Sequence, residues 1–186
     1  LVNSVNGKEE SLAAVLPLVK KYGGGLVCLT LDDDGIPETA EGRFAIAERI
    51  VARAEAIGIP RRELLIDGLT MPVSAGGENA NTTLATLRRA KEELGVKTVL
   101  GVSNVSFGLP NREQLNQSFF TLALAAGLDA AIVNPMSAGM MGAYRGYCAL
   151  RGLDEGCTAY MEAYRDFKPA APAAAAAPTA AKREDG

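Results

Sequence analysis

KTVLGVSNVSFGLPNR, residues 97–112, is the stretch of the sequence that decides the fold. Its first part, residues 98–102, is apolar and rich in β-branched side chains, which predicts a short strand covered on both faces, as in parallel sheets. Ser103 and Asn104 stand where this strand ends, and a loop with glycine and proline follows. In α/β sheets and barrels this end of the strands faces the ligand. Asn104 is therefore a candidate for ligand binding, although an asparagine in this place can instead cap the loop through its own backbone.

The same order of a strand followed by an amphipathic helix continues on both sides of this stretch. Strands are predicted at residues 1–5, 26–31, 63–69, 98–102 and 130–133, and helices at 9–22, 40–57, 79–94 and 112–126. Strict alternation of strands and helices indicates a parallel sheet. A complete (β/α)8 barrel takes about 250 residues, so five such units cannot close one.

The composition is typical of an ordinary soluble globular domain, with 48% hydrophobic residues, 22% charged residues and a net charge of -3. Lysines and arginines are scattered, and no apolar run approaches the roughly 20 residues that span a bilayer. We therefore expect neither a nucleic acid nor a membrane as partner, and a cytoplasmic location. The cysteines Cys28, Cys148 and Cys157 lack metal-ligand spacing, which predicts reduced packing residues and no metal site.

The chain contains no histidine, which excludes the commonest general base and every Ser/His or Cys/His nucleophile pair. Its chemistry must use carboxylates, amides and hydroxyls. Such groups do follow the predicted strands, without any Lys, Arg or His among them: Asn3, Ser4 and Asn6; Thr30, Asp32 and Asp33; Asp67; Ser103 and Asn104; Asn134. This set suits a neutral heterocycle that carries many hydrogen-bond donors and acceptors.

Asp67 is the most informative of these side chains because it follows an apolar strand and precedes Gly68. A buried carboxylate is costly unless it is paired or hydrogen-bonded, and its strand offers no cationic neighbour. Asp67 either accepts hydrogen bonds from adjacent N–H groups of a ligand, which is the interpretation we favour, or caps the loop that follows.

Residues 168–186 change character to a sequence of alanine and proline. Such a segment has no side chains that form a core, and its prolines interrupt a helix, so it predicts a semi-rigid linker to another domain.

Six segments together resemble a known family: LVNSVNGKEES, LTLDDDGIP, LLIDGLTMPVS, KTVLGVSNVSFGLPNR, LNQSFF and AAGLDAAIVNP. They are similar to the pterin-binding methyltransferase domains of cobalamin-dependent methionine synthases and of methyltetrahydrofolate:corrinoid/iron–sulfur protein methyltransferases. Dihydropteroate synthases are more distant relatives. The family fold is a (β/α)8 TIM barrel, and the five units resemble its fourth to eighth. The resemblance thus implies that residues 1–167 are a partial pterin-binding barrel domain whose first three β/α units are missing.

The resemblance also implies a set of site residues. By this likeness Asp67 holds the amino group and the adjacent ring N–H of a pterin, Asn3 lies on another ring edge, and Asn104 reaches N5. Ser103 and Asn134 complete the expected pterin site, with Asn104 and Asp67 as its catalytic residues. The family also uses an Asp on an earlier strand, in a segment that this chain lacks, and it usually has Asp-Pro where this chain has Asp67-Gly68.

The implied reaction is transfer of the N5 methyl group of 5-methyltetrahydrofolate to cob(I)alamin, as in methionine synthase. Asn104 would stabilise the charge at N5, and the proton would come from solvent or from a water relayed through Asp67. A chain without histidine cannot carry the DxHxxG-type corrinoid motif, so the cobalamin is expected on a further domain that follows the linker.

Three alternatives remain open. The first is a stand-alone methyltransferase that acts on a corrinoid protein. The second is an enzyme like dihydropteroate synthase, which would need basic residues at the strand end that carries Asn104, whereas Arg112 comes only later in the sequence. The third is a truncated pterin-binding module without catalysis.

Overall fold

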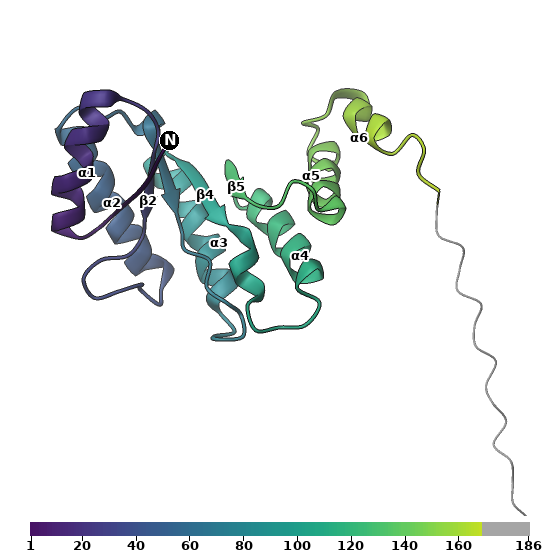
Figure 1. Cartoon of the computed structure of the whole chain (residues 1–186), viewed down its shortest axis with the longest axis horizontal. Helices are drawn as coiled ribbons and strands as arrows, with labels where there is room; N and C mark the ends of the chain where they lie inside the picture. Colours follow the sequence, from purple (N-terminus) through teal and green to yellow (C-terminus); the bar gives the residue numbers. More distant parts are fainter. Residues whose placement is uncertain (169–186) are drawn as a thin grey trace, which may run out of the picture.

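The computed structural model describes residues 1–168 and shows an α/β fold built on one parallel sheet of five strands (Figure 1). The strands lie in the sheet in chain order and are each parallel to their neighbours: β1 (Val2–Asn6), β2 (Leu26–Leu29), β3 (Leu64–Asp67), β4 (Lys97–Gly101) and β5 (Ala130–Ile132). The predicted fold class is thereby confirmed, whereas the share of a barrel that the chain represents stays a prediction. The predicted linker, apart from Lys168, lies outside the described residues.

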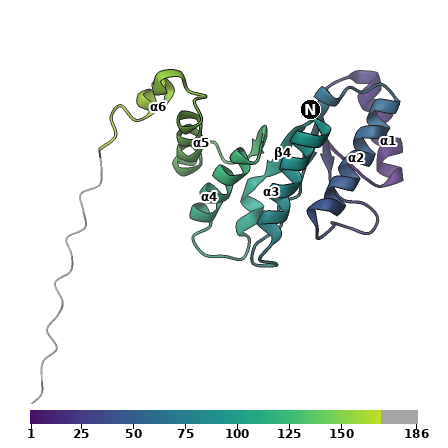
Figure 2. The ribbon, with the colours of Figure 1, turned by 180° about the vertical axis from the view of Figure 1, so that it is seen from behind.

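A helix follows every strand. α1 (Glu9–Tyr22), α2 (Ala40–Ala56), α3 (Asn79–Arg89), α4 (Arg112–Ala125) and α5 (Ala138–Leu150) follow β1 to β5, and the short α6 (Thr158–Ala163) comes last. Figures 1 and 2 show these helices following one another along the molecule. The four predicted helices begin at the observed residues, and α2 shows why: the Thr39 side chain accepts a hydrogen bond from Gly42 N–H (3.1 Å) as an N-cap. Within residues 1–168, no helix is long and apolar enough to cross a membrane.

Several elements end elsewhere than the sequence predicts. β3 ends at Asp67, because Leu69 adopts a left-handed backbone conformation with φ 56° that a strand cannot continue. β4 ends at Gly101, and the chain then forms a 3-10 helix, η3 (Val102–Ser106). The predicted helix 79–94 is α3 followed by a π-helical turn, η2 (Ala90–Leu94). The first two departures lie next to the predicted site, whereas η2 precedes the amino end of β4.

Two clusters of buried side chains hold the helices on the sheet. The first joins α1 and α2 to β1–β3 and includes Leu12, Ile50 and Ile66. The second joins α3 and α4 to β4 and η3 and includes Leu100 and Phe120. Each fully buried side chain of this size stabilises the fold by about 1.5–3 kcal/mol relative to an exposed one. The core therefore fixes β3 and β4 firmly, and with them the loops at their carboxyl ends.

Candidate functional site

The carboxyl ends of the strands carry most of the predicted site residues, and the sheet register shows how these residues align. Asp67 shares a row of the sheet with one residue from each of three other strands: Asn6, Leu29 and Val99. Asn3 is exposed and pairs with Val27, two rows nearer the amino ends of the strands. The register thus separates Asn3 from the row of Asp67, and its role in pterin binding stays a prediction.

The Asp67 carboxylate is buried and already takes part in a turn. Its side chain is 9% exposed, and Oδ1 accepts a hydrogen bond from Leu69 N–H (2.9 Å). Burial raises the pKa of Asp67 to about 6, against the opposing effects of this hydrogen bond and of the positive charge on Arg43. The capping role considered for Asp67 is therefore present in the structure. Each carboxylate oxygen has two lone pairs, so this bond leaves capacity for a ligand.

Arg43 of α2 is the cationic neighbour that the strand sequence of Asp67 does not reveal. Its side chain is 1% exposed, and its guanidinium donates hydrogen bonds to the carbonyl oxygens of Gly68 and Leu69 (2.8 Å each). The residues that follow the strands include no cation, and the positive charge at this turn comes instead from a helix earlier in the chain. One signal was available: Arg43 lies on the apolar face of α2, at helical spacing from Ala47 and Ile50.

Asn104 differs from the other asparagines that follow strands. Oδ1 of Asn6 accepts from Lys8 N–H (3.0 Å) and Oδ1 of Asn134 accepts from Met136 N–H (3.0 Å), so both side chains cap their own loops. Within the described part of the chain, the Asn104 side chain makes no hydrogen bond. Its Nδ2 lies 3.3 Å from the position that a Cβ on Gly101 would occupy, so the glycine leaves room for this amide. Of the two roles considered for Asn104, loop capping by the side chain is absent.

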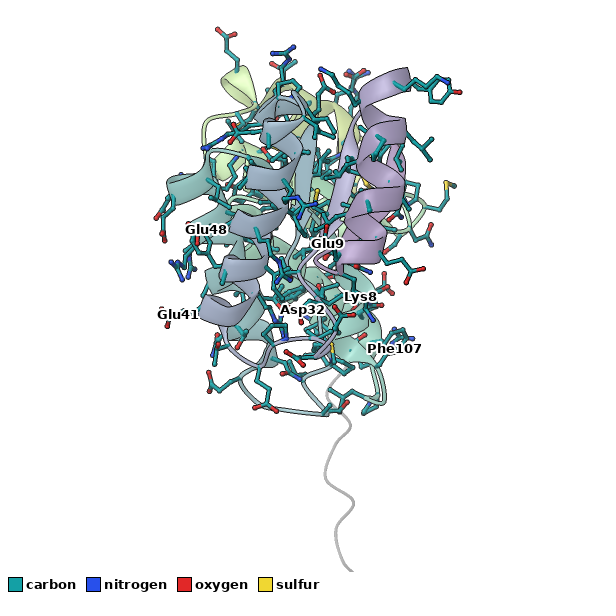
Figure 3. The ribbon with its side chains drawn as sticks, turned by 90° about the vertical axis from the view of Figure 1, so that its left-hand side faces the viewer. Lys8, Glu9, Asp32, Glu41, Glu48 and Phe107 are labelled. Atoms are coloured by element: carbon teal, nitrogen blue, oxygen red, sulfur yellow. The ribbon has the colours of Figure 1, made fainter. Side chains whose placement is uncertain are left out.

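Arg112, at the first turn of α4, folds back onto the loop after β4. Its guanidinium donates to the Ser103 carbonyl (2.9 Å) and to the Ser106 hydroxyl (3.0 Å), and it lies 4.5 Å from the centroid of the Phe107 ring. Figure 3 shows Phe107 at the same end of the molecule as Asp32, which follows β2. The sequence position of Arg112 suggested that it lies away from this strand end. The structure corrects this interpretation and places a cation there.

A cavity of about 540 Å³ lies beside this loop, between the carboxyl ends of β4 and β5. Its lining includes two predicted site residues, Ser103 and Asn134, together with Arg112 and Asn116. The Oδ1 atom of Asn116 is buried without a hydrogen-bond partner among the described residues. Asp67 and Asn104 do not line this cavity. Sequence reasoning missed Asn116, although it belongs to the quoted segment LNQSFF.

The side chains at the carboxyl ends of the strands can bind a ligand through hydrogen bonds and charge. Residues 1–168 hold no group of three or more His, Cys, Asp or Glu side chains that could bind a metal ion. A buried carboxylate with a raised pKa and an amide with free donors suit a ligand that offers N–H groups at one edge and a basic nitrogen at another.

The sequence is similar to those of a known methyltransferase and of known methionine synthases. The chain is 34% identical over 173 residues to a methylcorrinoid:tetrahydrofolate methyltransferase of Eubacterium limosum. This alignment covers 90% of the chain and 63% of the relative. It is 36% and 35% identical to the methionine synthases of Mycobacterium tuberculosis and Mycobacterium leprae, over 72% of the chain and 12% of each relative. The chain thus spans less than two thirds of the length of each of these relatives. Residues 1–134 match the family model described as pterin binding enzyme, and because this match covers well over half of the sequence, the chain belongs to the pterin-binding enzyme family.

Proposed function

We propose that this chain binds the pterin ring of 5-methyltetrahydrofolate at the carboxyl ends of β3 and β4 and supports transfer of the N5 methyl group to cob(I)alamin. The observation that carries the proposal is that Asp67 ends β3 and Asn104 follows the adjacent strand β4, in a chain whose relatives are named as a methyltransferase and as methionine synthases. Ser103 and Asn134 line the neighbouring cavity and extend the proposed substrate site.

Asp67 would bind the edge of the pterin that carries adjacent N–H groups. A carboxylate accepts two parallel hydrogen bonds best when it is ionised, and charge-assisted bonds of this kind are about twice as strong as neutral ones. With a pKa of about 6, most Asp67 side chains are ionised at pH 7. Ligand N–H groups would favour the ionised form further.

Asn104 would act at N5, where the reaction takes place. When the bond between N5 and the methyl carbon breaks, its electron pair stays on N5, which must then take up a proton. The corrinoid would supply the nucleophilic cobalt that accepts the methyl group, and we place it on another domain because this chain has no histidine for the DxHxxG-type corrinoid motif. The Asn104 amide can donate a hydrogen bond to N5 but cannot release a proton, so the proton comes from solvent or from a water held by Asp67.

Two kinds of parent protein fit this reaction. Methionine synthase uses it as one half of its cycle, which is the role we propose first. A stand-alone methyltransferase that exchanges the methyl group with a corrinoid protein is the alternative, and the longer match, over 90% rather than 72% of the chain, favours it. The same side chains serve either direction of transfer.

A second candidate function is condensation of a pterin pyrophosphate with an aromatic amine, as in dihydropteroate synthase. The position of Arg112 favours it, because its guanidinium lies at the strand end where a leaving pyrophosphate would need a cation. Condensation by the chain in the absence of a corrinoid would support this candidate.

The test is methyl transfer from 5-methyltetrahydrofolate to cob(I)alamin, followed by the corrinoid absorption spectrum. We expect Asn104→Ala to lower the rate about 100-fold, the size of effect that follows loss of one well-placed donor. Asn81→Ala, at an exposed site on α3, is the matched control and should leave the rate unchanged. An unchanged rate in Asn104→Ala would show that Asn104 does not act at N5.

A further inference from the structure

Arg43 is a buried cation to which the proposed reaction gives no role. Its Nε donates to the Pro37 carbonyl (2.8 Å), and its NH1 group lies within hydrogen-bond distance of the carbonyls of Gly68 and Leu69 and of the Thr83 hydroxyl (2.8, 2.8 and 3.3 Å). None of the salt bridges among the described residues includes Arg43. A buried charge without an ion-pair partner is costly, so the contacts that Arg43 makes must offset that cost.

These contacts converge on the turn that follows Asp67. Gly68 and Leu69 are the two residues after the carboxylate, and Leu69 has a left-handed backbone conformation (φ 56°) that non-glycine residues seldom adopt. Leu69 N–H donates to Asp67 Oδ1, so the position of this residue determines where the carboxylate points. The Thr83 hydroxyl of α3 also lies 3.1 Å from the Leu69 carbonyl. Arg43 and Thr83 thus hold the turn from two helices.

Arg43 also acts on Asp67 through its charge. The Arg43 guanidinium lowers the pKa of Asp67, while burial raises it more strongly. On the side of β2, the neutral Thr30 hydroxyl donates to the Asp67 carbonyl oxygen (3.0 Å). In α3, the side chains that pack near Gly68 are the neutral Thr83 and Thr86. Among the described residues, Arg43 is the charged group whose field moves the pKa of this carboxylate.

We infer that Arg43 is a positioning residue for Asp67: it fixes the turn at Gly68 and Leu69, aims the carboxylate and keeps its negative charge in a buried place. The part of this inference that concerns ligand binding rests on the proposed function. The part that concerns the carboxylate does not, and can be measured without ligand.

The experiment compares variants of the 186-residue chain. Arg43→Gln removes the charge, Arg43→Lys keeps the charge but loses the forked donor geometry, and Thr83→Val removes the second contact to the turn. Arg53→Gln is the matched control, since Arg53 lies on the same helix in an exposed ion pair with Glu9. The readouts are the carbon-13 carboxyl titration of Asp67, hydrogen exchange of the Leu69 amide, and calorimetric affinity for 5-methyltetrahydrofolate.

In Arg43→Gln we expect Asp67 to titrate about one pH unit higher than in the unmodified chain, as loss of a nearby opposite charge predicts. Arg43→Lys should keep the titration close to that of the unmodified chain. Leu69 amide exchange should be faster in Arg43→Lys and Thr83→Val, and both should bind 5-methyltetrahydrofolate about tenfold more weakly. Arg53→Gln should change none of the three readouts.

Unchanged titration in folded Arg43→Gln, or unchanged Leu69 exchange in folded Arg43→Lys and Thr83→Val, would overturn the inference. If Arg43→Gln does not fold, the exchange measured in the two conservative variants decides. If the unmodified chain does not bind 5-methyltetrahydrofolate, the proposed function fails, and the titration and exchange measurements still decide the role of Arg43.

Discussion

At the scale of a single residue, Asp67 combines two roles in one carboxylate. Oδ1 closes the turn at Leu69, while burial keeps the whole group largely out of water. Its pKa of about 6 lies above the ordinary value of 3.8. Between these two pH values, Asp67 is therefore mostly protonated in the folded chain and mostly ionised in the unfolded chain. The stability that this protonation provides is therefore full below pH 3.8 and is lost as the pH rises to about 6.

This difference predicts the pH dependence of an Asp67→Asn variant. Asn cannot titrate, so the unmodified chain should lose about 2.4 kcal/mol of unfolding free energy relative to the variant between pH 4 and 7. Urea unfolding of both proteins across this pH range measures the difference, in which the effects of the other acidic groups cancel. A difference that stays constant with pH would mean that Asp67 titrates in the folded chain as it does in an unfolded one.

The sequence allows Asp67 and Asn104 to be selected, because each follows an apolar strand at the end where α/β proteins bind ligands. It does not indicate which asparagine keeps its side chain free, since the capping bonds of Asn6 and Asn134 depend on local turn geometry. Arg43 is missed for a different reason. Its contacts to the turn after β3 are tertiary, and helical spacing shows only that Arg43 lies on the apolar face of α2, not which turn it contacts.

At the scale of the elements, β4 and β5 are joined by one carboxylate at their amino ends. Asp129 Oδ2 accepts from the backbone N–H and the hydroxyl of Thr98 (2.8 and 3.2 Å), and Lys91 Nζ lies 2.9 Å from Oδ1. Thr98 is fully buried, so its N–H has no access to water as a replacement partner. Asp129 therefore fixes the strand pair that carries the cavity at its other end.

We expect Asp129→Ala to destabilise the chain by about 1–3 kcal/mol, because it leaves a buried N–H without an acceptor. Glu93→Gln is the control, since the pair of Arg89 and Glu93 is an exposed contact at i,i+4 spacing and should contribute much less. Urea unfolding of both variants compares the two costs. Equal losses would show that the Asp129 contacts are no more important than a surface pair.

Helices were more predictable than strands in this chain. All four predicted helices begin at the observed residues, and for α2 the cause is a local signal, the Thr39 cap. The strand ends depend on contacts from elsewhere: Val73 N–H bonds to the Val105 carbonyl in η3, and Arg43 holds the turn after β3. The predicted strands 63–69 and 98–102 both continue past the observed strand ends, so the sequence pattern overestimates the strands.

At the scale of the whole molecule, the candidate site residues lie at the carboxyl ends of the strands, in two neighbouring places. Asp67 and Asn104 follow β3 and β4, and the cavity with Ser103 and Asn134 lies between the ends of β4 and β5. A pterin at the first place would leave the second for the remainder of a folate. The alternation of strands and helices predicts this arrangement, because parallel strands bring all their carboxyl ends to the same side.

The most direct measurement is calorimetric titration of 5-methyltetrahydrofolate into the folded chain and into its Asp67→Asn and Asn104→Ala variants. Our account predicts saturable binding by the unmodified chain and binding weakened about tenfold or more in Asp67→Asn, since one hydrogen bond to a charged group contributes about 1.5–3 kcal/mol. Asn104→Ala should weaken binding less than it slows methyl transfer, because its hydrogen bond strengthens as charge develops at N5. Absence of binding by the folded chain, or equal affinity in Asp67→Asn, would contradict a pterin site at the end of β3.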